Sequence, residues 1–387
     1  MRRLYYEDAY LAEFSAVVTA VRAAEDGCWA ALDRTAFYPG GGGQPEDAGE
    51  IAGARVTAVR EDADGRIWHR LEKPIGEGGV AARLDWARRF DLMQQHTGQH
   101  LLSAALSRKA GAETVGFHLT ATNLQIDLDR PVEAEALAAA EEAANGVIWE
   151  DRPVVCRFLT AGEAEGISWR KPPPREGPVR LVSVEDFDAS PCGGTHVRRT
   201  GEVGLIKITG VERLRGGMRV AFVCGGRALR DFRAKQAAVE ALVRELHSPP
   251  GGLVQACRRR RERLDELEKE LGRLKGLLLE REAEILTAGP GAVVAELSGR
   301  SAEELRALAA RIAGRGRLAV LAATAGGEAR LALARPAGQG PDLAAALRRV
   351  LPLLGGKGGG TASFAEGSGR ADRLGEALAA LREELGG

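Results

Sequence analysis

Two short motifs far apart in the chain constrain the fold most, because their side chains form a metal site only if the fold brings them together. The sequence HTGQH occupies residues 96–100, and CGGTH occupies residues 192–196. Each motif places two nitrogen or sulfur ligands four residues apart, and on a helix such positions share one face. Because a tetrahedral zinc ion takes about four ligands of these kinds, the two motifs together predict one bound Zn2+ ion. The expected ligands are His96, His100, Cys192 and His196.

Each pair alone has a simpler interpretation, and the number of ligands leaves a question open. Two histidines can lie on a half-buried helix face, and a cysteine can be buried in a glycine-rich turn. No glutamate follows His96, which excludes the H-E-x-x-H pattern of metalloproteases. Three histidines and one thiolate fill a tetrahedron, as in structural zinc sites, whereas catalytic sites keep a position for water. Either one of the four is not a permanent ligand, or the site expands when substrate arrives.

Composition sets broader limits on the class of protein. A chain of 387 residues is too long for one core, so we expect two or three domains. The 54 basic and 54 acidic residues cancel, which argues against a general polyanion binder but allows a local basic patch. The five cysteines include no C-x-x-C pair, so neither a disulfide framework nor a zinc ribbon is expected. Without a signal peptide or an apolar run of about 18 residues, we expect a cytoplasmic protein that does not span a membrane.

Hydrophobic and glycine patterns divide the first half of the chain into two parts of an α+β fold. Residues 1–88 show short β runs and predict a small β-barrel, with strands at 14–23, 28–32, 50–60 and 66–71. Residues 89–226 predict an α+β domain that contains both metal motifs. Its first helix is expected to start at Asp91 as N-cap and to end near Lys109. A second helix is expected over 133–145, and strands over 124–128, 154–159, 179–184, 203–209 and 218–223.

The second half of the chain begins with a helical pattern. Apolar residues recur with spacings of three and four over 229–246 and 264–278, and Ser248-Pro249-Pro250-Gly251-Gly252 interrupts them. This pattern predicts an antiparallel helical hairpin with a coiled-coil seam over residues 227–289. Residues 290–387 predict a C-terminal α/β domain, with strands at 292–297, 318–323 and 329–334 and helices at 301–313, 341–351 and 370–385. The glycine run at 355–360 is interpreted as a backbone-exposing loop.

The segment FYPGGGGQP at residues 37–45 has either a binding or a purely structural interpretation. As a contact loop, it would bring Gly41, Gly42, Gly43 and Gln44 close to a ligand, since glycine allows close backbone approach. As a hairpin tip, it would only be flexible. The Lys-Ser/Thr ending of a P-loop is absent.

Three further segments have the same pair of interpretations. Lys357 and the backbone amides of the glycine run can bind phosphate, or the run can be a tight turn. Arg170 and Lys171, in the basic loop 170–175, and the run at 258–261 can contact an RNA backbone or carry solvated charge.

Taken in order, these motifs resemble a known family. The loop at 37–45, the segment from Asp85-Trp86 to HTGQH, and CGGTH resemble the editing half of alanyl-tRNA synthetase, and more closely the free-standing AlaX trans-editing proteins. The helical hairpin and the glycine-rich last domain resemble the C-terminal region of the synthetase, a domain also found in DHH-type phosphoesterases. The resemblance covers the whole chain and matches the long AlaX type.

The resemblance implies an activity, a partner and roles for single residues. The activity is hydrolysis of the ester that joins serine, or alternatively glycine, to tRNA(Ala), by a zinc-dependent aminoacyl-tRNA hydrolase. His96, His100, Cys192 and His196 are then the metal positions. The candidates for catalytic roles are Thr97, Gln99 and His118. The candidates for contacts with substrate or tRNA are Gly41, Gly42, Gly43, Gln44, Phe117, Arg170, Lys171 and Lys357. The C-terminal region is expected to bind tRNA or to form a homodimer.

The selectivity that this activity demands is physically reasonable. A site that must hydrogen-bond the serine hydroxyl rejects alanine by roughly 10⁴-fold or more, because its own polar group is otherwise left unpaired. Two rival functions remain. A non-catalytic zinc-containing tRNA-binding protein would keep the same ligands, and so would a metal hydrolase of a small ester, which would not need the hairpin and last domain.

Overall fold

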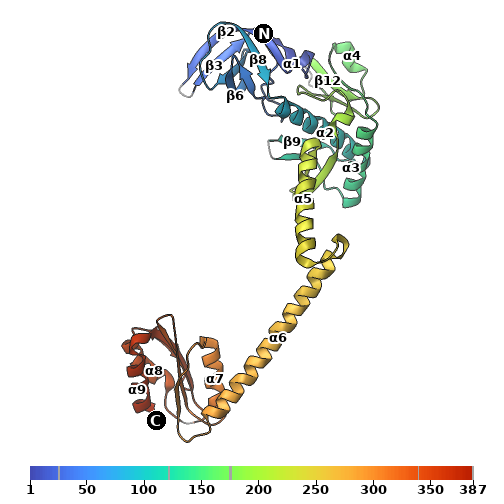
Figure 1. The fold of residues 1–387 in the computed structure, drawn as a ribbon. Coiled ribbons are helices and arrows are strands. Elements are labelled where there is room, and N and C mark those ends of the chain that lie inside the picture. Colours follow the sequence, from blue (N-terminus) through green and yellow to red (C-terminus); the bar gives the residue numbers. More distant parts are fainter. Residues whose placement is uncertain (25–26, 121–122, 174–176, 339, 386–387) are drawn as a thin grey trace. The chain divides into compact units, whose positions relative to one another are not determined.

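The chain folds into two units, Met1–Ala241 and Leu242–Gly387 (Figure 1). This computed structural model describes residues 1–24, 27–120, 123–173, 177–338 and 340–385. Arg175 of the predicted basic loop lies outside the described residues. Among the described helices, none combines the length and the apolar character needed to cross a membrane.

A closed six-stranded barrel begins the first unit, as the sequence predicts (Figure 1). Its strands neighbour one another in the order β2 (Glu13–Ala24), β3 (Gly27–Leu32), β7 (Ile67–Leu71), β6 (Ala54–Glu61), β5 (Gly49–Ile51) and β8 (Gly78–Leu84). In β6, Ala54, Val56 and Val59 are buried in the barrel core, and a register shift between Val56 and Ala58 interrupts their alternation. The single strand predicted over 50–60 is wrong. A turn with positive φ at Ala52 and Gly53 divides it into β5 and β6, which pair with each other.

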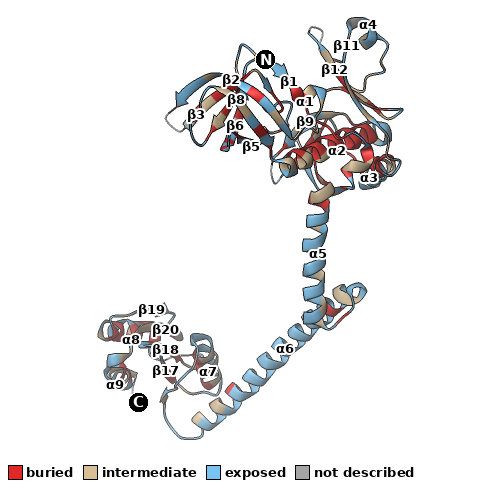
Figure 2. Ribbon diagram, turned by 45° about the horizontal axis from the view of Figure 1, so that its top comes forward, coloured by how far each residue is buried: buried red, intermediate tan, exposed pale blue. Residues whose placement is uncertain are grey.

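The long helix α2 (Trp86–Ala110) follows the barrel and carries the first metal motif. Asp85 is its N-cap, because the carboxylate accepts a hydrogen bond from the Arg88 amide. The predicted start at Asp91 is therefore wrong by more than one turn, and Asp91 instead pairs with Arg227. Figure 2 shows α2 as mostly buried, unlike the exposed helices α5 and α6.

A buried ion pair fixes α2 against the barrel segment. The Arg89 side chain has no exposed area and donates to both oxygens of Asp47. Its other nitrogens donate to the carbonyls of Ala9 and Ala36. Since every polar end of this cation is paired, the start of α2 is held at one place and angle.

Two antiparallel sheets complete the α+β part of the first unit. One has the order β14 (Ile206–Leu214), β15 (Gly217–Cys224), β10 (Leu124–Leu128) and β9 (Thr114–Leu119). The other has the order β11 (Val154–Leu159), β12 (Val179–Val184) and β13 (Asp188–Pro191). Helix α3 (Ala134–Trp149) packs with α2 in the same core as the first sheet. The strands β9 and β13 were not predicted, and both border the metal site.

Short elements fill the remaining connections of this unit. They are β1 (Arg2–Arg3), α1 (Leu4–Glu7), β4 (Arg34–Thr35), α4 (Ala161–Glu165) and the 3-10 turn η1 (Thr200–Val203). β1 and β4 pair in parallel.

The predicted helices of the heptad region are present. α5 covers Gly225–Leu246, the 3-10 turn η2 covers Pro250–Gly252, and α6 covers Leu253–Leu286. The interruption falls at the predicted prolines and glycines. Most heptad leucines of α6 are exposed, including Leu264, Leu271 and Leu278. The antiparallel pairing, the dimer and the predicted domain borders near 88, 226 and 289 stay predictions.

The C-terminal domain is a five-stranded sheet with helices. Its strands follow the order β16 (Val293–Glu296), β17 (Ala319–Ala325), β18 (Glu328–Ala334), β20 (Phe364–Arg370) and β19 (Lys357–Gly360). Its helices and 3-10 turns are α7 (Ala302–Gly314), α8 (Leu343–Val350), η3 (Leu351–Leu354), η4 (Ala371–Arg373) and α9 (Leu374–Leu385). The predicted loop at 355–360 is wrong, because most of it forms the edge strand β19. A Cβ at Gly358 of β19 would collide with the Glu366 carbonyl of β20, and a Cβ at Gly356, just before β19, would collide with the Ser368 carbonyl.

Candidate metal centre

The fold brings the two predicted motifs together. His96 and His100 project from α2, and Cys192 and His196 lie just after β13. Their four donor atoms lie within 4.8 Å of one another. The Cys192 Sγ is 3.4 Å from His96 Nε2 and 3.3 Å from His196 Nε2. In a zinc tetrahedron with bonds of about 2.0–2.3 Å, neighbouring donors are roughly 3.3–3.8 Å apart, so the set fits one such ion with small side-chain movements.

Each histidine of this set is tied through its Nδ1 atom to a different partner. His96 Nδ1 is 2.7 Å from Gln44 Oε1, and His196 Nδ1 is 3.1 Å from Thr97 Oγ1. His100 Nδ1 is 3.0 Å from Asp188 Oδ2. A hydrogen bond from Nδ1–H fixes the tautomer and leaves Nε2 as the metal-binding atom. The three outer contacts therefore orient all three imidazoles toward one point.

The outer partners are themselves held in place. Gln44 Nε2 donates to Thr195 Oγ1 over 2.8 Å, while its Oε1 also accepts from the Thr195 amide. Asp188 Oδ1 accepts from Arg170 Nε over 2.6 Å, and Arg170 Nη2 donates to Ser190 Oγ. The glycine-rich loop and the basic loop thus each support one ligand histidine.

Burial and neighbouring charges shift the pKa values of the ligands. Burial raises the pKa of the Cys192 thiol, but the neighbouring His96 and His196 and hydrogen bonds from the imidazoles lower it to well below its usual range. Burial, together with His96, lowers the pKa of His196 to about 3. Burial also lowers the pKa of His100, but its bonds to Asp188 and Cys192 outweigh this and raise it to about 9. Zinc ligation requires a thiolate and neutral imidazoles, so the metal would have to displace a proton from His100.

Glycine is required where the second motif meets the first. A Cβ on Gly194 would lie 2.5 Å from His96 Nδ1 and 2.8 Å from Gln44 Oε1. A Cβ on the neighbouring Gly193 would meet only the Tyr6 hydroxyl, at an ordinary 3.5 Å. Gly194 therefore allows the His96–Gln44 pair to approach the motif, whereas Gly193 has space for a side chain.

A chamber of about 280 Å³ is lined by three of the four candidate ligands, His96, His100 and Cys192. The lining also includes Gly42, Phe117, Gln99, Arg170 and Lys171, which the sequence analysis named as candidates and whose roles stay predictions. The Phe117 ring lies 5.3 Å from the His96 ring. Gln99 Nε2 donates to Ser103 Oγ over 2.8 Å, so the amide is fixed at the chamber wall. Gly41 and Gly43 belong to the turn beside it, and Gln44 supports His96.

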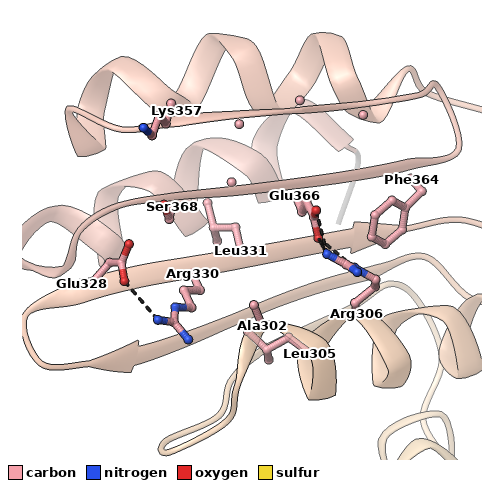
Figure 3. A pocket seen from close by; sticks show the side chains of 14 residues that line it. Ala302, Leu305, Arg306, Glu328, Arg330, Leu331, Lys357, Phe364, Glu366 and Ser368 are labelled. Carbon is pink, nitrogen blue, oxygen red and sulfur yellow. Dashed lines mark hydrogen bonds and ion pairs between the residues drawn. The ribbon is translucent and has the colours of Figure 1, made fainter. Parts of the chain in front are cut away.

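Two residues that the sequence analysis named as site candidates lie outside the chamber. Successive residues of a strand face opposite sides, so His118 on β9 faces away from Phe117 and the chamber. Its half-exposed ring pairs with Asp127 over 3.0 Å, and no role in the chamber follows from this placement. Lys357 lies in the second unit, at the end of a pocket of about 830 Å³ that the glycines of β19 also line (Figure 3).

Sequence reasoning missed the residues that support the ligands. Asp188, Ser190 and Arg180 belong to no short motif, and the first two lie on the unpredicted strand β13. Arg180 Nη1 donates to the carbonyls of Cys192 and Gly194, and so holds the second motif in shape. The one available signal was the position of Asp188 and Ser190 shortly before Cys192.

Comparisons with known proteins identify the family. Residues 179–219 match the threonyl and alanyl tRNA synthetase second additional domain, and residues 289–387 match the DHHA1 domain. The alanyl-tRNA editing protein AlaX-L of Pyrococcus horikoshii is 32% identical over 384 residues, which cover 95% of this chain and 94% of that protein. The chain belongs to the AlaX family of alanyl-tRNA editing proteins. This confirms the family predicted from the motifs.

AlaX proteins share this region with larger enzymes. The alanine–tRNA ligase of Pyrococcus abyssi is 34% identical over 390 residues, which cover 95% of this chain but 42% of the ligase. The chain thus spans less than half the length of that relative. The solved C-Ala domain of Aquifex aeolicus alanyl-tRNA synthetase is 25% identical, with a TM-score of 0.24, and the match covers 26% of this chain and 97% of that domain.

Proposed function

We propose that this protein is a zinc-dependent deacylase that hydrolyses the ester bond between serine and tRNA(Ala), with glycine as a second substrate to be tested. The observation that carries the proposal is the four-ligand centre beside a small chamber, in a chain of the AlaX family. AlaX-L is described as an alanyl-tRNA editing protein, and the same class of substrate suits the chamber found here.

The chain's own residues supply the binding and positioning. A zinc ion, when bound, polarises an ester carbonyl or lowers the pKa of water to about 7. Gln44, Thr97 and Asp188 hold the three imidazoles, so the ligands need little rearrangement when substrate enters. Pre-organisation of this kind favours the transition state, since no reorientation is left for the reaction itself.

Gln99 is the residue that we assign to the serine hydroxyl. Its amide lies on the chamber wall and is held by Ser103. With Nε2 held by Ser103, the amide oxygen Oε1 can accept a hydrogen bond from the serine hydroxyl, and it loses this bond when alanine binds. This single lost hydrogen bond disfavours alanine by about 1–3 kcal/mol, which is one part of the roughly 10⁴-fold selectivity that a whole site of this kind can reach.

Deacylation of two esters tests the function. Seryl- and alanyl-tRNA(Ala) are each incubated with the wild-type protein and with Cys192→Ala. We expect fast release of serine, slow release of alanine and loss of activity in the variant. If neither ester is cleaved while tRNA still binds, the protein is a non-catalytic tRNA-binding module. If small serine esters are cleaved as well as seryl-tRNA, it is a hydrolase without a tRNA requirement.

A further inference from the structure

A second cavity opens beside the metal chamber and shares a wall with it. This cavity, here called the vestibule, has a volume of about 790 Å³ and is lined by Arg3, Tyr6, Phe158, Lys171, Pro178 and Pro191, among others. Lys171, Pro191, Cys192 and Gly193 line both the vestibule and the chamber. A ligand in the vestibule would therefore lie next to the metal ligand Cys192.

The vestibule has flat apolar walls. The rings of Tyr6 and Phe158 are 5.2 Å apart at an interplanar angle of 86°. Phe158 is 48% exposed, although it is a large apolar side chain on strand β11. Aromatic faces of this kind bind nucleic-acid bases by stacking, which tolerates different sequences because every base has a π-face.

The charged residues of the vestibule favour an anion. Arg3, Lys171 and Arg180 line it, and none of the described lining residues is acidic. Arg180 is mostly buried, lies over the Tyr6 ring and donates to the Cys192 and Gly194 carbonyls, so it joins the aromatic wall to the metal motif. Arg3 is paired with Glu61, whereas Lys171 is exposed at the border of the two cavities. Lys171 is therefore the cation placed to meet a phosphate.

We infer that the vestibule binds the 3′-terminal nucleotide of the aminoacyl-tRNA, with the base against Tyr6 and Phe158 and a phosphate near Lys171. This inference rests on the proposed function and extends it to the nucleotide that carries the amino acid. A base and a phosphate could also come from a free mononucleotide. The terminal nucleotide fits better, because only a ligand with an attached amino acid fills the vestibule and the adjoining chamber together.

Fluorescence of a labelled tRNA end tests the inference. The terminal adenosine of tRNA(Ala) is replaced by 2-aminopurine riboside, whose emission falls on stacking. We expect the wild-type protein to quench it. Phe158→Leu should lose most of the quench and lower kcat/KM for seryl-tRNA by roughly tenfold, with unchanged zinc content. Trp149→Leu removes a similarly exposed ring from α3, away from the vestibule lining, and should behave as wild type.

Other outcomes separate this inference from the proposed function. Lys171→Met should reduce the slope of log affinity against log salt by about 0.7, the value for one phosphate of a single strand. The vestibule assignment would be wrong if serine is released without any quench, or if Phe158→Leu leaves the quench intact. Neither result would contradict the proposed deacylase activity. A Phe158-dependent quench without serine release would contradict the deacylase only. Free AMP is added as a competitor of the labelled tRNA. If AMP prevents the quench at concentrations as low as that of the tRNA, the vestibule is a site for a free nucleotide and the inference is wrong.

Discussion

Substitution of Gly194 by alanine provides a steric test of the metal centre. The added Cβ would lie 2.5 Å from His96 Nδ1 and 2.8 Å from Gln44 Oε1. The atom nearest to the added Cβ is His96 Cε1. Non-bonded carbon contacts are normally about 3.5 Å or longer, so Gln44 Oε1 must move by about 0.7 Å and the His96 ring by about 1 Å or more. Loss of an outer hydrogen bond to a ligand typically weakens metal binding by about 10- to 100-fold. We expect a loss of zinc affinity in this range for Gly194→Ala.

The adjacent glycine is the matched control. In Gly193→Ala the new Cβ meets only the Tyr6 hydroxyl, at 3.5 Å, so zinc affinity should stay within about twofold of wild type. Both affinities can be measured by competition with a chromophoric chelator, together with thermal unfolding of each variant. If Gly194→Ala binds zinc as tightly as Gly193→Ala, then His96 does not hold the metal in the way described.

Asp188→Asn should weaken zinc binding by about 10- to 100-fold, because His100 loses its charged partner. A chelator titration measures the zinc affinity. An unchanged affinity would show that Asp188 does not support the metal centre. In the metal-free protein the raised pKa of His100, about 9, means that its pairing stabilises the fold fully below pH 6.5 and is lost as the pH rises through 9. Unfolding temperatures should accordingly show this loss in the wild type and less of it in Asp188→Asn. Gln99→Leu should reduce the ratio of the deacylation rates for seryl- and alanyl-tRNA(Ala) by about 10- to 100-fold. His118→Ala should leave this ratio unchanged. The reverse result would assign the serine hydroxyl to His118 and not to Gln99. Arg89→Ala should destabilise the protein by about 3–5 kcal/mol in denaturant unfolding, because Asp47 is left buried without its cation and keeps the hydrogen bond from the Tyr38 amide. A change below about 1 kcal/mol would contradict the anchoring of α2.

The sequence was informative where a pattern has a local cause. The i, i+4 spacing placed His96 and His100 on one helix, and the heptads and prolines located α5, η2 and α6. The short β runs of residues 1–88 predicted the barrel. Local signals also misled, since Asp91 resembles an N-cap, although Asp85 performs that role.

The parts that sequence could not provide depend on contacts between distant residues. β13 has only four residues and no strong alternation, so Asp188 gave no sign that it would support His100. β19 is made of a lysine and glycines, which have low strand propensity, and it forms because β20 lies beside it. Arg170 was expected to contact RNA because it is basic, but its guanidinium is engaged by Asp188 and Ser190.

The central claim is that one zinc ion at these four ligands makes the protein a seryl-tRNA(Ala) deacylase. The most direct test is to titrate the metal-free protein with zinc and to measure the rate of serine release from seryl-tRNA(Ala) at each step. The account predicts that the rate rises linearly and reaches a plateau at one zinc per chain, and that Cys192→Ala shows no such rise. A rate that is already full in the metal-free protein would contradict the account.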